Sequence, residues 1–133
     1  MAAAKYTPRP WGLDREFFRL ALETGTVHVQ RCNACGRHQH PPRAFCAACA
    51  SQDLSFVPTT NRGEVYSWTV SHFTTDPGWV DDLPYATVVV ELAEGPRVVG
   101  TYSGDHEDLQ LGLAVTIRPE ARTEDFAYLW VDG

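Results

Sequence analysis

The sequence lacks the long apolar runs and the export features of membrane and secreted proteins. No apolar stretch in its 133 residues approaches the roughly 18–20 residues that a membrane-spanning helix needs. The start, residues 1–8, has no apolar core of the length found in a secretory signal. We therefore expect a cytoplasmic protein that does not associate with membranes.

Common catalytic motifs are missing as well. The sequence contains no G-x-S-x-G, no H-E-x-x-H and no glycine-rich phosphate loop. His72 and His106 each stand among polar neighbours, and adjacent Asp81 and Asp82 point apart on a predicted loop. Distant residues that converge in a fold leave no motif, but the local patterns predict a chain that is not catalytic alone.

Acidic residues are absent from one basic segment. The chain carries a formal charge of −6, which disfavours general binding to a phosphate backbone. Residues 26–52 nevertheless contain no Asp or Glu. Two explanations stay open: the basic side chains offset a negative tetrathiolate, or they form an anion-binding patch for a phosphorylated ligand. The segment contains His28, Arg31, Arg37, His38, His40 and Arg43.

The cysteines carry the clearest signal. All four fall within 18 residues, as two C-x-x-C pairs separated by ten residues. Two disulfides would suit an exported domain, for which the sequence has no signal. Four thiolates at about 2.3 Å complete a tetrahedral zinc site and leave no position open for water or substrate. The sequence therefore predicts one structural zinc ion bound by Cys32, Cys35, Cys46 and Cys49.

The chain before the first cysteine predicts an arm and one helix. Pro8 and Pro10 favour an extended arm, and Asp14 is a plausible N-cap for a helix that continues to Thr24. Gly25 would end this helix in a left-handed C-cap. The apolar face with Phe17 and Phe18 either covers the protein's own domain or meets a partner.

The remaining pattern is β. Strand-like alternation over residues 26–31 leads into the cysteines, and five further β segments follow residue 63. The loop over residues 74–84 holds Trp79, which either folds back onto the domain or marks a contact surface. We expect strands over Glu64–Phe73 (Val65, Ser67 and Thr69 on one face, Tyr66, Trp68 and Val70 on the other), Tyr85–Leu92 (buried on both faces), Arg97–Tyr102, Leu113–Arg118 and Phe126–Val131.

These elements predict a mainly β protein with an N-terminal helix, a rubredoxin-like zinc ribbon and a five-stranded OB-fold barrel. A short twisted sandwich is the competing architecture. The expected division is an arm and helix over 1–25, the zinc ribbon over 26–60 and the OB-fold domain over 61–133.

Several segments together resemble one known family. They are Gln30–Gly36, Pro41-Pro42-Arg43, Cys46–Cys49, Gly63–Val70, Pro84-Tyr85, Glu94-Gly95 and Leu111-Gly112. They are similar to the acyl-CoA-associated zinc-ribbon/OB-fold family, catalogued as domain of unknown function 35. This family usually has proline after the first cysteine of the second knuckle and glycine after the second, where this chain has Ala47 and Ala50. Ala50 is strained if that turn needs a positive φ.

The resemblance implies a non-catalytic accessory subunit of a thiolase-fold aldolase or thiolase, including aldolases that shorten steroid side chains. The carbon–carbon bond chemistry then belongs to the partner, and a CoA thioester is the ligand of the complex. Arg side chains could meet its phosphates through charge-assisted, bidentate contacts. The candidates are Arg31, Arg37, His38, His40 and Arg43.

Two other functions remain as alternatives. OB folds and zinc ribbons both occur in nucleic-acid-binding modules, but the acidic charge and the lack of interleaved basic and aromatic residues on the strands disfavour this class. A stand-alone acyl-CoA enzyme is the third hypothesis.

Overall fold

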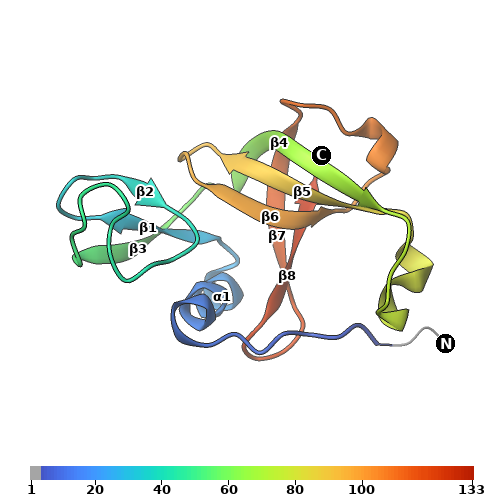
Figure 1. Cartoon of the computed structure of the whole chain (residues 1–133), viewed down its shortest axis with the longest axis horizontal. Coiled ribbons are helices and arrows are strands. Elements are labelled where there is room, and N and C mark those ends of the chain that lie inside the picture. The colour runs from blue at the N-terminus through green and yellow to red at the C-terminus, as the bar shows by residue number, and fades with distance from the viewer. Residues whose placement is uncertain (1–3) are drawn as a thin grey trace.

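The computed structural model describes residues 4–133, so the first three residues of the expected arm lie outside the described part. A three-stranded ribbon and a closed barrel lie side by side, with one helix below them (Figure 1). The elements in chain order are α1 (Gly12–Thr24), β1 (His28–Cys32), β2 (His38–Gln39), β3 (Leu54–Pro58), β4 (Arg62–Ser71), η1 (Pro77–Asp82), β5 (Tyr85–Leu92), β6 (Arg97–Tyr102), η2 (His106–Asp108), β7 (Ala114–Ala121) and β8 (Ala127–Asp132).

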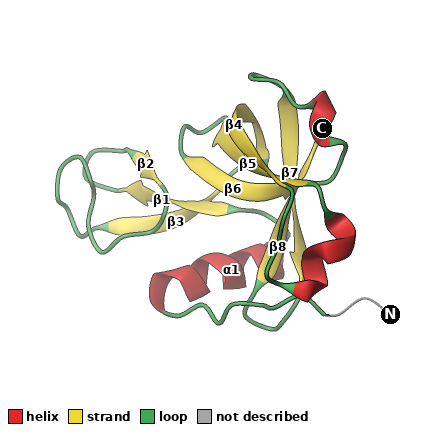
Figure 2. Ribbon diagram, turned by 45° about the vertical axis from the view of Figure 1, so that its right-hand side comes forward, coloured by secondary structure: helices red, strands yellow, loops and turns green. Residues whose placement is uncertain are grey.

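Helix α1 begins two residues earlier than predicted, and it packs against the rest of the same protein (Figure 2). Trp11 is the N-cap without a side-chain hydrogen bond, and Asp14 lies in the first turn. The C-cap prediction is confirmed: Gly25 has φ 72° and its N–H donates to the Ala21 carbonyl. Phe17 is 4% exposed within the main core. Phe18 packs against Phe126 with ring centroids 4.8 Å apart, so this face is used internally.

The closed barrel confirms the OB-fold prediction and excludes the alternative of a twisted sandwich. Its strands close in the order β4-β5-β6-β8-β7, with antiparallel pairing except between β6 and β8. The described residues contain no helix long and apolar enough to cross a membrane.

Strand β4 contains a bulge that the predicted alternation missed. The register with β5 shifts between Val65 and Ser67, so Tyr66 and Ser67 are both exposed. Val65 points into the core before the bulge, and Trp68 and Val70 pack against the core after it. The prediction that Val65, Ser67 and Thr69 share one face is therefore wrong. The extra residue at the bulge moves every later side chain of the strand to the opposite face.

Strand β5 is also less buried than predicted. Ala86, Val88, Val90 and Leu92 are buried, but the alternate side chains are only partly covered. The β-branched composition predicts burial on both faces, and this prediction is wrong for the outer face. The outer face instead lies at the barrel surface, where Tyr85 and Thr87 each line a hollow.

Asn61 joins the three parts of the fold. Its side-chain amide donates to the Gly25 carbonyl at 3.0 Å and accepts from the Val27 N–H at 2.8 Å. Its own carbonyl accepts from the Ile117 N–H at 2.7 Å. One residue thus fixes the end of α1, the entry into the ribbon and strand β7 of the barrel.

Candidate metal centre and basic pocket

The four cysteines converge at the tip of the ribbon. Cys32 ends β1 and begins the first knuckle, and Cys46 and Cys49 form the second knuckle in the loop between β2 and β3. The Sγ atoms of Cys32 and Cys49 are 3.6 Å apart, and those of Cys35 and Cys46 are 3.7 Å apart. All four sulfur atoms lie within 4.8 Å of one another.

Both knuckles have the same backbone design. The Gly36 N–H donates to the Cys32 carbonyl at 2.8 Å, and the Ala50 N–H donates to the Cys46 carbonyl at 2.9 Å. Gly36 has φ 82° and Ala50 has φ 62°. The second knuckle therefore requires the positive φ considered in the sequence analysis, and alanine adopts it there.

Backbone N–H groups favour the thiolate form of the inner cysteines. The Cys35 N–H points at Cys32 Sγ from 3.5 Å, and the Ala48 N–H points at Cys46 Sγ from 3.3 Å. Donors directed at sulfur, the Cys35 N–H first, lower the pKa of Cys32 to about 6. The pKa of Cys46 is lowered too, mainly by the Cys49 backbone N–H.

The geometry fits a zinc ion. Zinc–sulfur bonds of about 2.3 Å in a tetrahedron place neighbouring sulfurs about 3.8 Å apart, close to the two measured separations. Cys32 and Cys46 are buried, whereas Cys35 and Cys49 face outward. Four thiolates in this arrangement would hold zinc in a closed, structural site.

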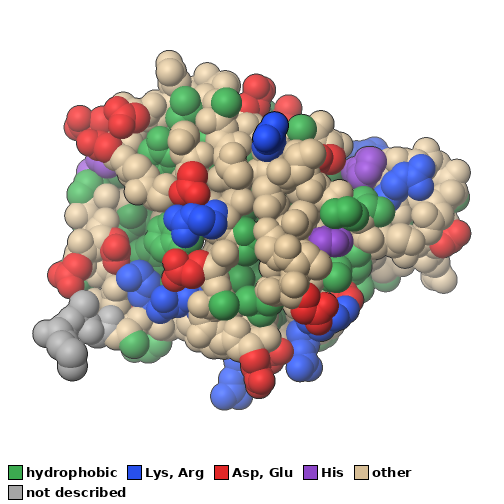
Figure 3. All heavy atoms as spheres, turned by 180° about the vertical axis from the view of Figure 1, so that it is seen from behind, with side chains coloured by type: hydrophobic (Ala, Val, Ile, Leu, Met, Phe, Trp, Pro, Cys, Tyr) green, Lys and Arg blue, Asp and Glu red, His purple; other side chains and the backbone are tan. Residues whose placement is uncertain are grey.

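A basic pocket of about 550 Å³ opens between the ribbon and the turn that joins β5 to β6. Among residues 4–133, no Asp or Glu lines it. Four of the five predicted CoA-binding residues lie here: Arg37, His38, His40 and Arg43. Figure 3 shows histidine and basic side chains on the ribbon, at the right of the view, and mixed charges over the barrel.

Two buried glutamines hold the loop that carries Arg43. Gln30 accepts from the Arg43 N–H at 2.8 Å and donates to the Arg43 carbonyl at 2.9 Å. Gln39 donates to Gln30 Oε1 at 2.8 Å and accepts from the Ala47 N–H at 2.9 Å. No sequence pattern reveals this pair, because its one distinguishing feature is that two polar residues occupy facing, buried strand positions.

His40 differs from the predicted phosphate ligand because it is uncharged at neutral pH. Its ring packs on Phe17 with centroids 4.8 Å apart. Burial lowers its pKa to about 4, although Asp14 acts in the opposite direction. His40 therefore lines the pocket as a neutral hydrogen-bonding group.

The pocket leaves out the candidate Arg31 and includes Arg97, which is not one of the predicted candidates. Arg31 is not among the lining residues, and its guanidinium lies beside Gly36 in the first knuckle. Arg97, at the start of β6, lines the pocket instead. Its guanidinium stacks on Tyr66 at 3.6 Å and its Nε donates to Glu91 at 3.1 Å. Tyr66 lies exposed at the bulge in β4, and its ring positions Arg97, the fifth Arg or His side chain in the pocket.

Comparison with protein families gives two matches that adjoin without a gap. The family model of the ChsH2 rubredoxin-like zinc ribbon domain matches residues 21–55. The model of the ChsH2 C-terminal OB-fold domain matches residues 56–119. The boundary falls between Ser55 and Phe56, within β3 of the ribbon sheet.

Curated relatives are longer than this chain. A probable enoyl-CoA hydratase alpha subunit from Thermomonospora curvata is 35% identical over 83% of this chain and 34% of its own length. The 3-oxo-4,17-pregnadiene-20-carboxyl-CoA hydratase alpha subunit of Mycobacterium tuberculosis is 31% identical over 77% and 32%. The benzoylsuccinyl-CoA thiolase subunit BbsA of Thauera aromatica is 28% identical over 56% and 49%. This chain thus spans a third to a half of these proteins.

Two solved structures share the fold. A chain of the Ltp2-ChsH2(DUF35) aldolase superposes with a TM-score of 0.83 and 28% identity, covering 95% of this chain and 98% of that one. A DUF35-family protein of unknown function from Sulfolobus solfataricus gives a TM-score of 0.62 at 18% identity, covering 91% of this chain and 85% of that one. The second likeness shows the fold alone.

Proposed function

Because the chain belongs to the ChsH2 (DUF35) family of zinc-ribbon and OB-fold proteins, we propose that it is a non-catalytic accessory subunit that binds and completes a thiolase-fold enzyme acting on acyl-CoA thioesters. The observation that carries this proposal is the superposition on almost the whole of one chain of the Ltp2-ChsH2(DUF35) aldolase. A thiolase subunit among the relatives supports the same class of partner. Within this class we favour retro-aldol cleavage of a steroid side chain, because the structural neighbour is an aldolase and one relative is named as a hydratase subunit for a pregnadiene-carboxyl-CoA.

The metal supports this role structurally. A zinc ion held by Cys32, Cys35, Cys46 and Cys49 would fix both knuckles, and through them the loop that carries the basic pocket. The binding free energy of the metal then becomes folding free energy of the ribbon. The bond-breaking groups belong to the partner.

The basic pocket is the proposed contact for the phosphates of CoA. Arg37, Arg43 and Arg97 line one hollow, and Arg37 and Arg43 are both exposed. Guanidinium groups bind phosphates through paired, charge-assisted hydrogen bonds. His38 adds an imidazole that can donate a hydrogen bond to a phosphate oxygen, and neutral His40 adds a polar atom at the wall.

The competing nucleic-acid function has less support from the barrel. OB folds bind oligonucleotides on the face formed by their second and third strands and two adjoining loops. In this chain that face is flanked by Asp82, Glu120 and Asp125, and the ring of Phe18 from α1 covers Phe126 in one of the loops. Each of these carboxylates is paired with a cation of the same chain, so it is the net charge of −6 that disfavours binding to a phosphate backbone.

The decisive experiment is an affinity pull-down of the tagged chain from its native host, with mass spectrometry of the proteins that co-purify. A stoichiometric thiolase-fold protein is the expected result, and the assay that follows is acyl-CoA turnover by the pair and by each chain alone. Recovery of nucleic acid or ribosomal proteins without a thiolase relative would overturn the proposal, and so would turnover by this chain alone.

The CoA contact is tested with the reconstituted complex. Arg37→Gln and Arg43→Gln should each weaken CoA binding about tenfold, because each removes a charge-assisted phosphate contact. Arg62→Gln is the matched control, since it removes the same charge from an exposed site that lines other hollows. An equal effect of all three variants would point to general electrostatics instead of a defined site.

A further inference from the structure

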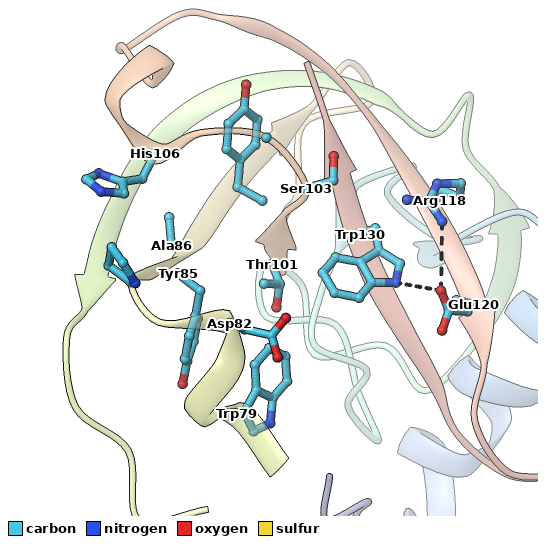
Figure 4. Close-up of a pocket in the computed structure, with 13 residues that line it drawn as sticks. Trp79, Asp82, Tyr85, Ala86, Thr101, Ser103, His106, Arg118, Glu120 and Trp130 are labelled. Carbon is cyan, nitrogen blue, oxygen red and sulfur yellow. Dashed lines mark hydrogen bonds and ion pairs between the residues drawn. The ribbon is translucent and has the colours of Figure 1, made fainter. Parts of the chain in front are cut away.

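Strand β6 has one backbone edge that is only partly paired. It pairs with β5 along residues 97–101, but on its other side it pairs with β8 only at Thr101 and Tyr102. Figure 4 shows Thr101 beside its partner Trp130, at the point where the two strands meet. Before this junction, no strand in the described part of the chain pairs with β6 on the β8 side.

The unpaired edge presents the backbone groups of Arg97 and Val99. In an antiparallel pair, alternate residues direct their N–H and C=O groups toward the partner strand or away from it. The Leu92 N–H donates to the Pro96 carbonyl at 2.9 Å, and this bonded pair sets the alternation between β5 and β6. Val98 therefore bonds toward β5, whereas Arg97 and Val99 direct their N–H and C=O groups to the open side.

The edge begins at the basic pocket. Arg97 lines that pocket, and its guanidinium is held by Tyr66 and Glu91. Among the ion pairs within the described residues, none involves Arg37 or Arg43. These two arginines therefore supply the free positive charge of the pocket, and a ligand whose phosphates they hold has the edge of β6 next to it.

The edge ends at an apolar hollow of about 300 Å³. Val99 lines this hollow and is 56% exposed. It follows Arg97 by two residues, or about 7 Å along the strand, and shares its face. Phe18 of α1 and Phe126 and Leu129 beside β8 supply further parts of the wall. Positive charge, free hydrogen-bonding groups and an apolar surface thus follow one another along a single strand.

We propose that this edge binds the pantetheine arm of a CoA thioester. The arm is an extended chain with amide groups, which would pair with the N–H and C=O groups of Val99 in the manner of an added strand. Its phosphates would occupy the basic pocket, and its methyl groups would contact the apolar hollow. The identity of the ligand rests on the proposed function, whereas the open edge does not.

An extended peptide of the partner is the other kind of chain that pairs with a strand edge. The pantetheine arm fits better because the free edge offers only Arg97 and Val99, whereas a strand of a protein is usually about 5–6 residues long. The arm also arrives attached to phosphates, for which the neighbouring pocket has unpaired arginines.

Amide NMR of the zinc-loaded full chain, without any partner, tests this proposal. The probes are CoA and adenosine 3′,5′-bisphosphate, which carries phosphates on the same nucleoside but has no arm. We expect CoA to bind about tenfold more tightly than the bisphosphate. The Val99 N–H resonance should move downfield with CoA and stay in place with the bisphosphate. Equal affinities, no binding of CoA, or a Val99 shift that appears only when the partner is added would each overturn the proposal.

Variants separate the arm from the phosphates. Val99→Pro removes the N–H at a position where an edge strand tolerates proline, and it should weaken CoA binding about fivefold with little effect on the bisphosphate. Val99→Thr keeps the N–H and should lose distinctly less. Arg37→Gln should weaken both ligands to the same degree. If Val99→Pro does not fold, the Val99 resonance of the unchanged protein still decides the question.

This proposal and the accessory role can fail separately. A chain that binds CoA through the Val99 N–H but captures no thiolase-fold protein keeps the site and removes the accessory role. A chain that captures the enzyme but binds CoA no better than the bisphosphate keeps the role and removes the contact with the arm.

Discussion

Replacing Ala50 with glycine should stabilise the protein by about 0.5–1 kcal/mol. An L-residue in the left-handed region costs roughly 1–2 kcal/mol, and Ala50 sits there with φ 62°. Glycine removes that cost, but it gives the unfolded chain more conformational freedom, which lowers the free energy of unfolding by about 0.4–1 kcal/mol. The methyl group of Ala50 is exposed, so its loss forfeits little packing.

Two measurements on the zinc-loaded protein test this prediction. Urea unfolding should show a higher midpoint at an unchanged slope, because the variant alters a backbone conformation and not the surface that unfolding exposes. Competition with a chelator should show zinc affinity raised about two- to fivefold, since metal binding is coupled to folding of the knuckle.

A substitution in the first knuckle tests the same reasoning in the opposite direction. Gly36 occupies the equivalent position with φ 82°, and the nearest atom to an added Cβ is Arg31 Nη2 at 3.6 Å. Gly36→Ala should therefore lose about what Ala50→Gly gains, through backbone strain and without a clash. Ala48→Gly, at an exposed position outside the positive-φ region, should be neutral or slightly destabilising. The reasoning fails if Ala50→Gly is no more stable than Ala48→Gly.

Three further predictions concern Asn61, His40 and the metal. Asn61→Ala should lower the free energy of unfolding by about 2–3 kcal/mol, because the Val27 N–H loses its acceptor; a loss under about 1 kcal/mol in urea titrations would contradict this. The pKa of His40 is lowered from 6.5 to about 4, so the folded state resists protonation, and the stability present above pH 6.5 falls as the pH drops from 6.5 towards 4. An NMR titration should place the His40 midpoint near 4, and one near 6.5 would exclude burial as the cause. Chelation of zinc should remove hydrogen-exchange protection from the Gly36 and Ala50 N–H groups first, whereas simultaneous loss throughout the barrel would mean that ribbon and barrel unfold as one unit.

The features predicted correctly from sequence are those with a local signal. The C-x-x-C pairs predict the cysteine cluster because two intervening residues allow the backbone to curl around a metal. Gly25 predicts the end of α1, since glycine alone adopts the left-handed C-cap at no steric cost. The barrel strands were found within a few residues because their β-branched residues cluster between turns.

The features that were missed depend on contacts between distant segments. Arg97 enters the basic pocket because the β5–β6 turn lies against the ribbon, which no periodicity reveals. His40 loses its charge because Phe17 of the helix covers it, although its neighbours in sequence are polar or proline. The bulge at Tyr66 leaves no mark in a strand whose residue types alternate through it. In each case three-dimensional packing changes a property that sequence order indicates.

Asn61 fixes where the ribbon stands relative to the barrel. Its side chain is bonded to the end of α1 and to the entry of the ribbon, and its carbonyl is bonded to β7, so the ribbon cannot swing without breaking hydrogen bonds in the other two parts of the fold. The wall of the basic pocket is shared by the ribbon and the β5–β6 turn, so the width of the pocket depends on this connection as well as on its own lining residues. A substitution at Asn61 would therefore change the shape of the basic pocket from a distance, without touching any residue that lines it.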